Sequence, residues 1–104
     1  MDNFRPNQGG TFAFTANGVS QNFALPPGGG LFVRVSNAGA NIAYGELTNN
    51  ANLPAVVPTS TTPGGFPITA NQPALLVMMR PTDSRLSLIS AGNSTVYVTR
   101  GDLI

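Results

Sequence analysis

Residues 85–100 read RLSLISAGNSTVYVTR, with two short runs of alternating apolar and polar residues on either side of a turn. Leu86 and Leu88 share one face of the first run, and Val96 and Val98 share one face of the second, because successive side chains of a strand point to opposite faces. The intervening AGNS combines residues that favour turns. The stretch predicts two adjacent antiparallel strands, each with one aliphatic face turned toward a core.

The same pattern occurs twice in the first half of the chain. Residues 11–16 and 19–25 alternate on either side of Asn17-Gly18, a dipeptide that suits the two-residue type I′ turn of a β-hairpin. Residues 31–35 and 41–47 alternate on either side of a second compact turn, SNAGAN. Each pair of runs is therefore predicted to form a hairpin.

The second half contains a long loop and two further strand signals. Residues 48–65 hold three prolines, three asparagines and a cluster of threonine and serine, as expected of a loop, with one short edge strand over residues 53–57. Residues 66–69 form a short alternating run. Residues 74–79, ALLVMM, are almost continuously apolar, which is typical of a strand buried on both faces.

These signals predict an all-β fold with a single domain over residues 11–104. We expect a β-sandwich or jelly roll of seven to eight short antiparallel strands. Residues 1–10 are predicted to form an extended N-terminal arm, because Pro6, Gly9 and Gly10 interrupt regular structure. The side chains predicted to lie between the two sheets are Val19, Val33, Val35, Ile42, Leu76, Met78, Leu86, Leu88, Val96 and Val98.

The chain offers few side chains for chemistry. It has no histidine, cysteine, lysine or tryptophan, and Glu46 is its only glutamate. Most catalysis requires a titratable group tuned toward neutral pH, and a serine nucleophile requires a base. Asp83, Ser84 and Arg85 fit a turn in which the side chains bond to the local backbone. We therefore expect no enzyme activity, no catalytic residue, no cofactor and no metal site.

Charge and hydropathy exclude two classes of partner. The five cations are dispersed arginines and the net charge is +1, so we expect no nucleic-acid binding. No apolar run reaches the ~18 residues that span a bilayer, so we expect no membrane insertion. The first ten residues are polar and lack the apolar core of a signal peptide, and the chain is therefore expected to be made in the cytoplasm.

A low charge content fits a surface that is covered by other proteins and fits a merely neutral secreted or viral surface equally well. Only 9% of residues are charged, against about 25% in typical domains. The predicted arm carries one large apolar side chain, Phe4, next to the planar guanidinium group of Arg5, and the predicted loop carries exposed aliphatic side chains. The aromatic group Phe12, Phe14 and Phe23 fits either a hairpin core or an interface. The candidate interface residues are Phe4, Arg5, Leu53, Val56, Val57 and Phe66.

Three stretches resemble small phage virion proteins of the capsid decoration or cement type. They are FVRVSNAGANIAY (residues 32–44), PITANQPALLVM (67–78) and RLSLISAGNSTVYVTRGDLI (85–104). The resemblance implies a β-sandwich or jelly-roll subunit, a homo-oligomer that is a dimer or trimer, seated on the lattice of the major capsid protein at the exterior of the virion. It does not extend to residues 48–65.

The sequence leaves two other functions open. The chain could instead be a tail or head–tail component or an adhesion spike of the phage. A carbohydrate-binding sandwich would use exposed aromatic side chains as a platform, but the chain has no tryptophan and only two tyrosines, Tyr44 and Tyr97. The capsid decoration role is the function that we expect.

Overall fold

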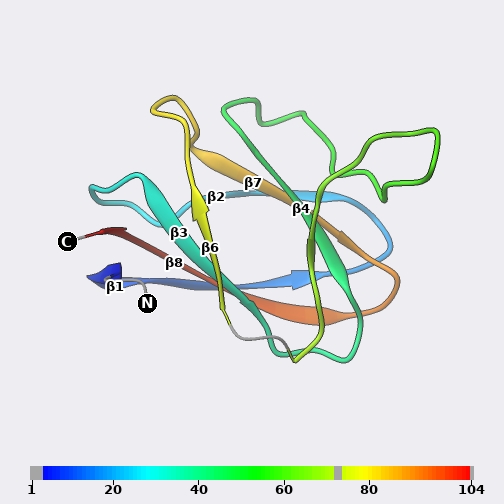
Figure 1. The fold of residues 1–104 in the computed structure, drawn as a ribbon, viewed down its shortest axis with the longest axis horizontal. Helices are drawn as coiled ribbons and strands as arrows, with labels where there is room; N and C mark the ends of the chain where they lie inside the picture. Colours follow the sequence, from blue (N-terminus) through cyan, green and yellow to red (C-terminus); the bar gives the residue numbers. More distant parts are fainter. Residues whose placement is uncertain (1–3, 72–73, 104) are drawn as a thin grey trace.

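The part of the chain that the structure describes forms eight strands in two antiparallel sheets (Figure 1). The computed structural model describes residues 4–71 and 74–103. In chain order the strands are β1 (Phe4–Ala16), β2 (Gln21–Ala24), β3 (Phe32–Asn37), β4 (Ala43–Thr48), β5 (Phe66–Ile68), β6 (Leu75–Met78), β7 (Arg85–Ser90) and β8 (Ser94–Leu103). One sheet has the order β1-β8-β3-β6 and the other has the order β2-β7-β4-β5. The predicted all-β sandwich is confirmed.

The strand pairing is nested, as in a jelly roll. β1 pairs with β8, β2 with β7, β3 with β6 and β4 with β5, which is the pattern of a long two-stranded ribbon rolled into two sheets. Rolling the ribbon then brings β3 beside β8 and β4 beside β7. Every connection between consecutive strands except β4–β5 crosses from one sheet to the other. The first and last strands therefore lie side by side.

The hydrophobic core lies between the two sheets. Six of the ten predicted core residues are fully buried: Val33, Val35, Leu86, Leu88, Val96 and Val98. Ile42 and Leu76 are only half-buried. Three predictions are wrong: Val19 is 72% exposed in a turn, and Leu76 and Met78 point to the outer face of the edge strand β6, where Met78 is 68% exposed. The remaining core residues are Ala16, Leu25, Ala43, Leu47, Ile68 and Met79.

The predicted hairpins are wrong, although their strands exist. β1 and β2 belong to different sheets, and so do β3 and β4, and β7 and β8. Gly18 does not adopt a positive φ, so the type I′ turn does not form. The Asn17 side chain instead accepts a hydrogen bond from the Val19 amide at 2.9 Å. An alternation of apolar and polar residues shows only that a strand has one face turned toward the core, and this is true of strands in both sheets. The pattern therefore does not tell whether a strand pairs with the preceding strand or lies opposite it across the core.

The aromatic group closes the side of the sandwich formed by β1 and β2. Phe14 and Phe23 stack across the two sheets with ring centroids 4.2 Å apart, and Phe12 lies 5.6 Å from Phe14. Phe14 and Phe23 pack against the core, whereas Phe12 is partly exposed. Of the two interpretations, core or interface, the core therefore holds for Phe14 and Phe23.

Residues 4–10 of the predicted arm belong to the sheet, which corrects that prediction. Phe4, Arg5 and Pro6 pair with Leu103, Asp102 and Gly101 of β8. The register shifts between Pro6 and Thr11, and Gly9 has a φ of +64° there. Proline and glycine are tolerated because β1 is an edge strand and an irregularity absorbs them. Residues 1–3 of the predicted arm lie outside the described residues.

Two predictions for the second half also need correction. The ALLVMM run forms β6, which is an edge strand beside β3 rather than a strand buried on both faces. Residues 53–57 form no strand and belong to the connection between β4 and β5, so that connection is a loop over residues 49–65. Within residues 4–71 and 74–103 there is no helix long and apolar enough to cross a membrane.

Candidate interaction surfaces

The loop of residues 49–65 is fastened to the outer face of the β2-β7-β4-β5 sheet. The Asn22 side-chain amide donates hydrogen bonds to the carbonyl oxygens of Asn50 and Leu53, both at 3.1 Å. The Ser87 hydroxyl also donates to the Leu53 carbonyl, and the Ala55 amide donates to the Ser20 hydroxyl at 2.7 Å. Ser87 points outward from β7 yet is fully buried, because the loop covers it.

The returning part of the loop lies directly against its outgoing part. The Gly65 amide donates to the Val56 carbonyl at 2.9 Å. A Cβ atom at position 64 would lie 2.2 Å from the Val56 carbonyl oxygen and 2.6 Å from the nitrogen of Pro58, so only glycine fits there. The two parts of the loop therefore form a fixed pair of walls above the sheet.

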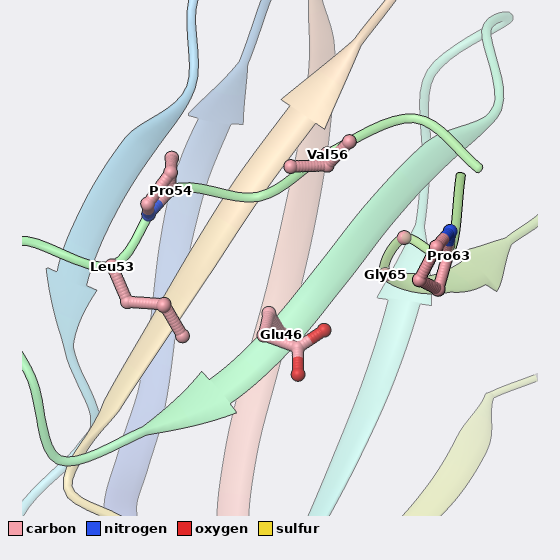
Figure 2. A pocket seen from close by; sticks show the side chains of 7 residues that line it. Glu46, Leu53, Pro54, Val56, Pro63 and Gly65 are labelled. Atoms are coloured by element: carbon pink, nitrogen blue, oxygen red, sulfur yellow. The ribbon is translucent and has the colours of Figure 1, made fainter.

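A pocket of about 280 Å³ lies between these walls (Figure 2). Leu53, Pro54 and Val56 line it from the outgoing part of the loop, and Pro63, Gly64 and Gly65 line it from the returning part. Glu46 projects from the outer face of β4 into the space between them. We call this the Glu46 pocket. Its lining is apolar except for the carboxylate and exposed backbone.

Glu46 has no hydrogen bond or ion pair with any other residue that the structure describes. The side chain is half-buried, because the loop shields one side of it. The carboxyl groups of the other described acidic residues are engaged: Asp83 binds Arg80, and Asp102 accepts a hydrogen bond from the Leu103 amide at 3.0 Å. Glu46 is therefore an acceptor that is available to a cation from outside the molecule.

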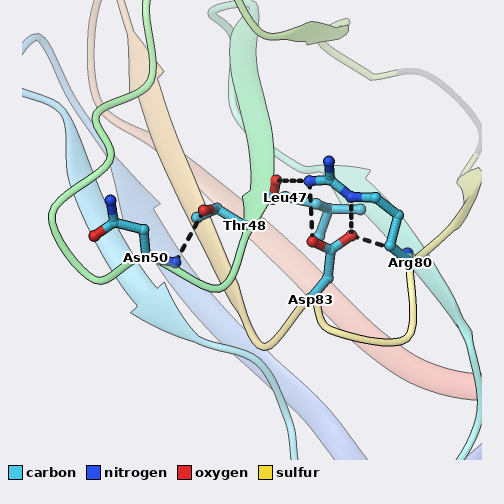
Figure 3. A network of polar contacts seen from close by, with 5 residues as sticks. All are labelled: Leu47, Thr48, Asn50, Arg80 and Asp83. Carbon is cyan, nitrogen blue, oxygen red and sulfur yellow. Dashed lines mark hydrogen bonds and ion pairs between the residues drawn. The ribbon is translucent and has the colours of Figure 1, made fainter.

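Arg80 and Asp83 form a structural ion pair at the turn between β6 and β7 (Figure 3). Asp83 is buried and accepts hydrogen bonds from the Arg80 amide at 2.9 Å and from its guanidinium at 3.1 Å and 3.3 Å. The guanidinium also donates to the Leu47 carbonyl at 3.1 Å. The hydrogen bond to Asp83 raises the pKa of Arg80 above its usual value, so the guanidinium stays charged. The prediction of a turn over Asp83, Ser84 and Arg85 is right for Asp83, whose side chain bonds to the local backbone, but Arg85 lies in β7 and bonds to Asn22.

A second candidate surface lies on the outer face of the β1-β8-β3-β6 sheet. Phe32 and Arg34 of β3 lie opposite Met78 and Leu76 of β6, and directly opposed residues point to the same face. The Arg34 guanidinium carbon lies 4.5 Å from the centroid of the Phe4 ring. We call these five residues the Met78 patch. Arg34 is its only charged residue, and Met78 is its most exposed large side chain.

The six predicted interface residues do not form one surface. Leu53 and Val56 line the Glu46 pocket, and Val57 is exposed farther along the same loop. Phe66 packs against the core instead. Phe4 belongs to the Met78 patch, and Arg5 is exposed beside it on β1.

Sequence reasoning missed the importance of Glu46 and of Met78. The only glutamate of the chain, placed in a strand just before a proline-rich loop, was the available signal for the pocket. The signal for the patch was the length of the apolar ALLVMM run. Because β6 is an edge strand, part of this run stays uncovered. Among residues 4–71 and 74–103, no three acidic side chains lie close enough together to hold a metal ion.

Comparison of the chain with protein-family models, with curated proteins and with solved structures found no significant match. The functional argument therefore depends on the two surfaces and on the fold.

Proposed function

We propose that this chain is a structural virion protein that decorates a phage head, binds the lattice of the major capsid protein and stabilises the shell. The observation that carries the proposal is the Met78 patch, an apolar group on a sheet face with a single charge. Isolated exposed apolar side chains are normal, but Met78 is exposed next to the half-buried Phe4, Phe32 and Leu76, and an apolar group of this kind is typical of a protein-binding site.

The fold and the composition support this proposal. Eight-stranded jelly rolls occur in viral capsid proteins and in lectins, although a fold alone does not determine function. The low charge content reduces the desolvation cost of covering large parts of the surface. A ligand that binds only the assembled lattice stabilises it by a free energy that grows with the logarithm of the ratio of its free concentration to its dissociation constant. Such a role requires contact surfaces and no catalytic group.

The Met78 patch has the properties of a docking face. Met78 is 68% exposed, and covering its side chain contributes on the order of 1–2 kcal/mol. Phe32 and Leu76 are held beside it by strand pairing, so little conformational entropy is lost when a partner covers them.

The free edge of β1 supports the proposed homo-oligomer, a dimer or trimer. β1 is an edge strand that pairs with β8 on one side. Residues 11–16, TFAFTA, contain no charge and no proline, which are the usual protections of an exposed edge. Two such edges can pair antiparallel about a two-fold axis and join the sheets of two copies. Sedimentation velocity measures the resulting mass.

The experiment is to replace Met78 by glutamate and to measure how much of the protein is bound to purified particles. We expect strongly reduced occupancy and lower survival of the particles on heating, because a charge must then be buried at the contact. Val19→Glu is the matched control, since Val19 is 72% exposed on a turn distant from the patch. Equal loss in both variants, or in neither, would remove the docking role of the patch.

The distribution of the protein on the particle distinguishes this function from its alternative. Many copies spread over the head support a decoration protein. A few copies at one vertex would instead indicate a tail or head–tail component or an adhesion spike, and labelling with an antibody in electron micrographs separates the two results.

A further inference from the structure

The Glu46 pocket has the chemistry of a site for a cationic side chain. Glu46 makes no hydrogen bond or ion pair with the described residues, and only the charge of Arg80, which is bonded to Asp83, acts on it at longer range. Such a half-buried carboxylate is energetically unfavourable unless water or an external cation solvates it. The walls around it are apolar, being formed by leucine, valine and two prolines. A ligand that satisfies both features has an apolar stem and a positively charged end.

The volume is sufficient for a single long side chain. Pockets that enclose small-molecule ligands usually have volumes of about 300–1,000 Å³. The Glu46 pocket, at about 280 Å³, lies just below this range. Arginine and lysine combine an apolar stem with a charged head, and only arginine presents a planar fork that matches both carboxylate oxygens. The guanidinium is also less strongly hydrated than an ammonium group, so it loses less on entering the pocket.

The cation must come from another molecule. Arg80 and Arg85 are bonded to Asp83 and Asn22, and Arg100 donates to the carbonyl groups of Pro26 and Gly30. Arg34 lies over Phe4, and Arg5 is on β1 of the opposite sheet. None of the five arginines of this chain occupies the pocket.

We propose that the Glu46 pocket binds an arginine side chain presented by a protein partner. The guanidinium donates two hydrogen bonds to the Glu46 carboxylate, and the stem packs between Val56 and Pro63. The site is preorganised, because hydrogen bonds to Ser20, Asn22 and Ser87 hold the loop in place before any ligand enters. Preorganisation lowers the entropy cost of binding.

The pocket and the Met78 patch lie on opposite outer faces of the sandwich. A subunit with both sites can contact two neighbouring proteins at once, as a bridging role in a lattice would require. The inference about the pocket does not rest on the proposed virion function, because it can be tested with the isolated chain.

The test is a titration of the ¹⁵N-labelled chain with the peptide acetyl-Gly-Arg-Gly-amide, followed by NMR. We expect the amide signals of Val56, Gly64 and Gly65 to shift, with a dissociation constant on the order of 1 mM or weaker for one side chain. The matched control is the same peptide with citrulline, which keeps the shape of arginine and removes its charge. We expect it to bind about tenfold more weakly, because charge-assisted hydrogen bonds are about twice as strong as neutral ones.

Glu46→Gln provides the complementary test on the protein. This variant keeps the shape of the side chain, so thermal unfolding should be unchanged while the shifts caused by the arginine peptide disappear. Equal binding of the citrulline peptide, or of the arginine peptide to Glu46→Gln, would contradict the proposal. A lysine peptide that binds as tightly as the arginine peptide would overturn the preference for a guanidinium. If the arginine peptide shifts only amide signals outside the Glu46 pocket, the proposed binding site is wrong.

Discussion

Asn22 connects the 49–65 loop to the sheet, and its removal should release the loop. The NH₂ group of its side chain donates hydrogen bonds to the backbone carbonyl groups of Asn50 and Leu53 and to the Ser87 hydroxyl. The Oδ1 atom of the same side chain accepts a hydrogen bond from the Arg85 guanidinium. Asn22→Ala removes all of these hydrogen bonds. In this variant, the Ser87 hydroxyl remains as a side-chain donor to the Leu53 carbonyl.

The expected loss of stability follows from the number and type of these bonds. A neutral hydrogen bond contributes a net of about 0.5–1.5 kcal/mol, and one to a charged group about 1.5–3 kcal/mol. Because the two N–H groups of the amide are shared among three acceptors, we expect Asn22→Ala to lower the free energy of unfolding by about 2–4 kcal/mol. Urea denaturation with linear extrapolation measures this quantity.

Hydrogen exchange tests whether the loop is the part that is released. The amides of Ala55 and Gly65 are held by the Ser20 hydroxyl and the Val56 carbonyl, so they should exchange faster in the variant by more than global unfolding accounts for. Asn22→Asp is the matched control, because it keeps an acceptor for Arg85 and loses both donors to the loop. We expect it to release the loop with a smaller loss of stability.

The reasoning would be refuted by an Asn22→Ala variant whose stability lies within about 0.5 kcal/mol of the native chain, the range of an inert surface substitution. Unchanged exchange at Ala55 and Gly65 would refute it equally, because the loop would then be held by other contacts.

Three further substitutions test the core, the loop and the turn. Leu86→Ala, at a fully buried position of a central strand, should cost about 2–5 kcal/mol in calorimetry, and a loss below 1 kcal/mol would place the core elsewhere. Gly64→Ala should cost about 1–3 kcal/mol in urea, since its Cβ would lie 2.2 Å from a carbonyl oxygen, whereas Gly29→Ala, with nothing within 4 Å, should be nearly neutral. Asp83→Ala should cost about 1–3 kcal/mol by thermal unfolding, because it leaves the Arg80 amide without its acceptor, and an unchanged melting temperature would show that this turn is not stabilising.

The strands were predictable from sequence because alternation reports burial directly. Val33, Val35, Val96 and Val98 lie between the sheets as their spacing indicates. Which strands pair was not predictable from these local patterns. In a sandwich the inner face of each sheet has the same alternation, so AGNS and Asn17-Gly18 indicate reversals of the chain without specifying whether the next strand is beside or opposite.

Edge position explains the other errors. The run that forms β6 has the composition of a central strand, but pairing order makes it an edge, and Met78 is therefore exposed. Pro6 and Gly9 suggest an interruption, but pairing with β8 outweighs their local preference. The Glu46 pocket depends on how a loop without regular structure lies over the sheet, and no periodicity in sequence encodes that arrangement.

Cryo-electron microscopy of purified particles would test the central proposal most directly, since it can both locate the chain and orient its two sheets. Our account predicts one subunit position repeated over the head, with the β1-β8-β3-β6 sheet facing the shell and Met78 at the contact. A particle that lacks this chain, or a subunit whose β1-β8-β3-β6 face is directed toward solvent, would contradict it.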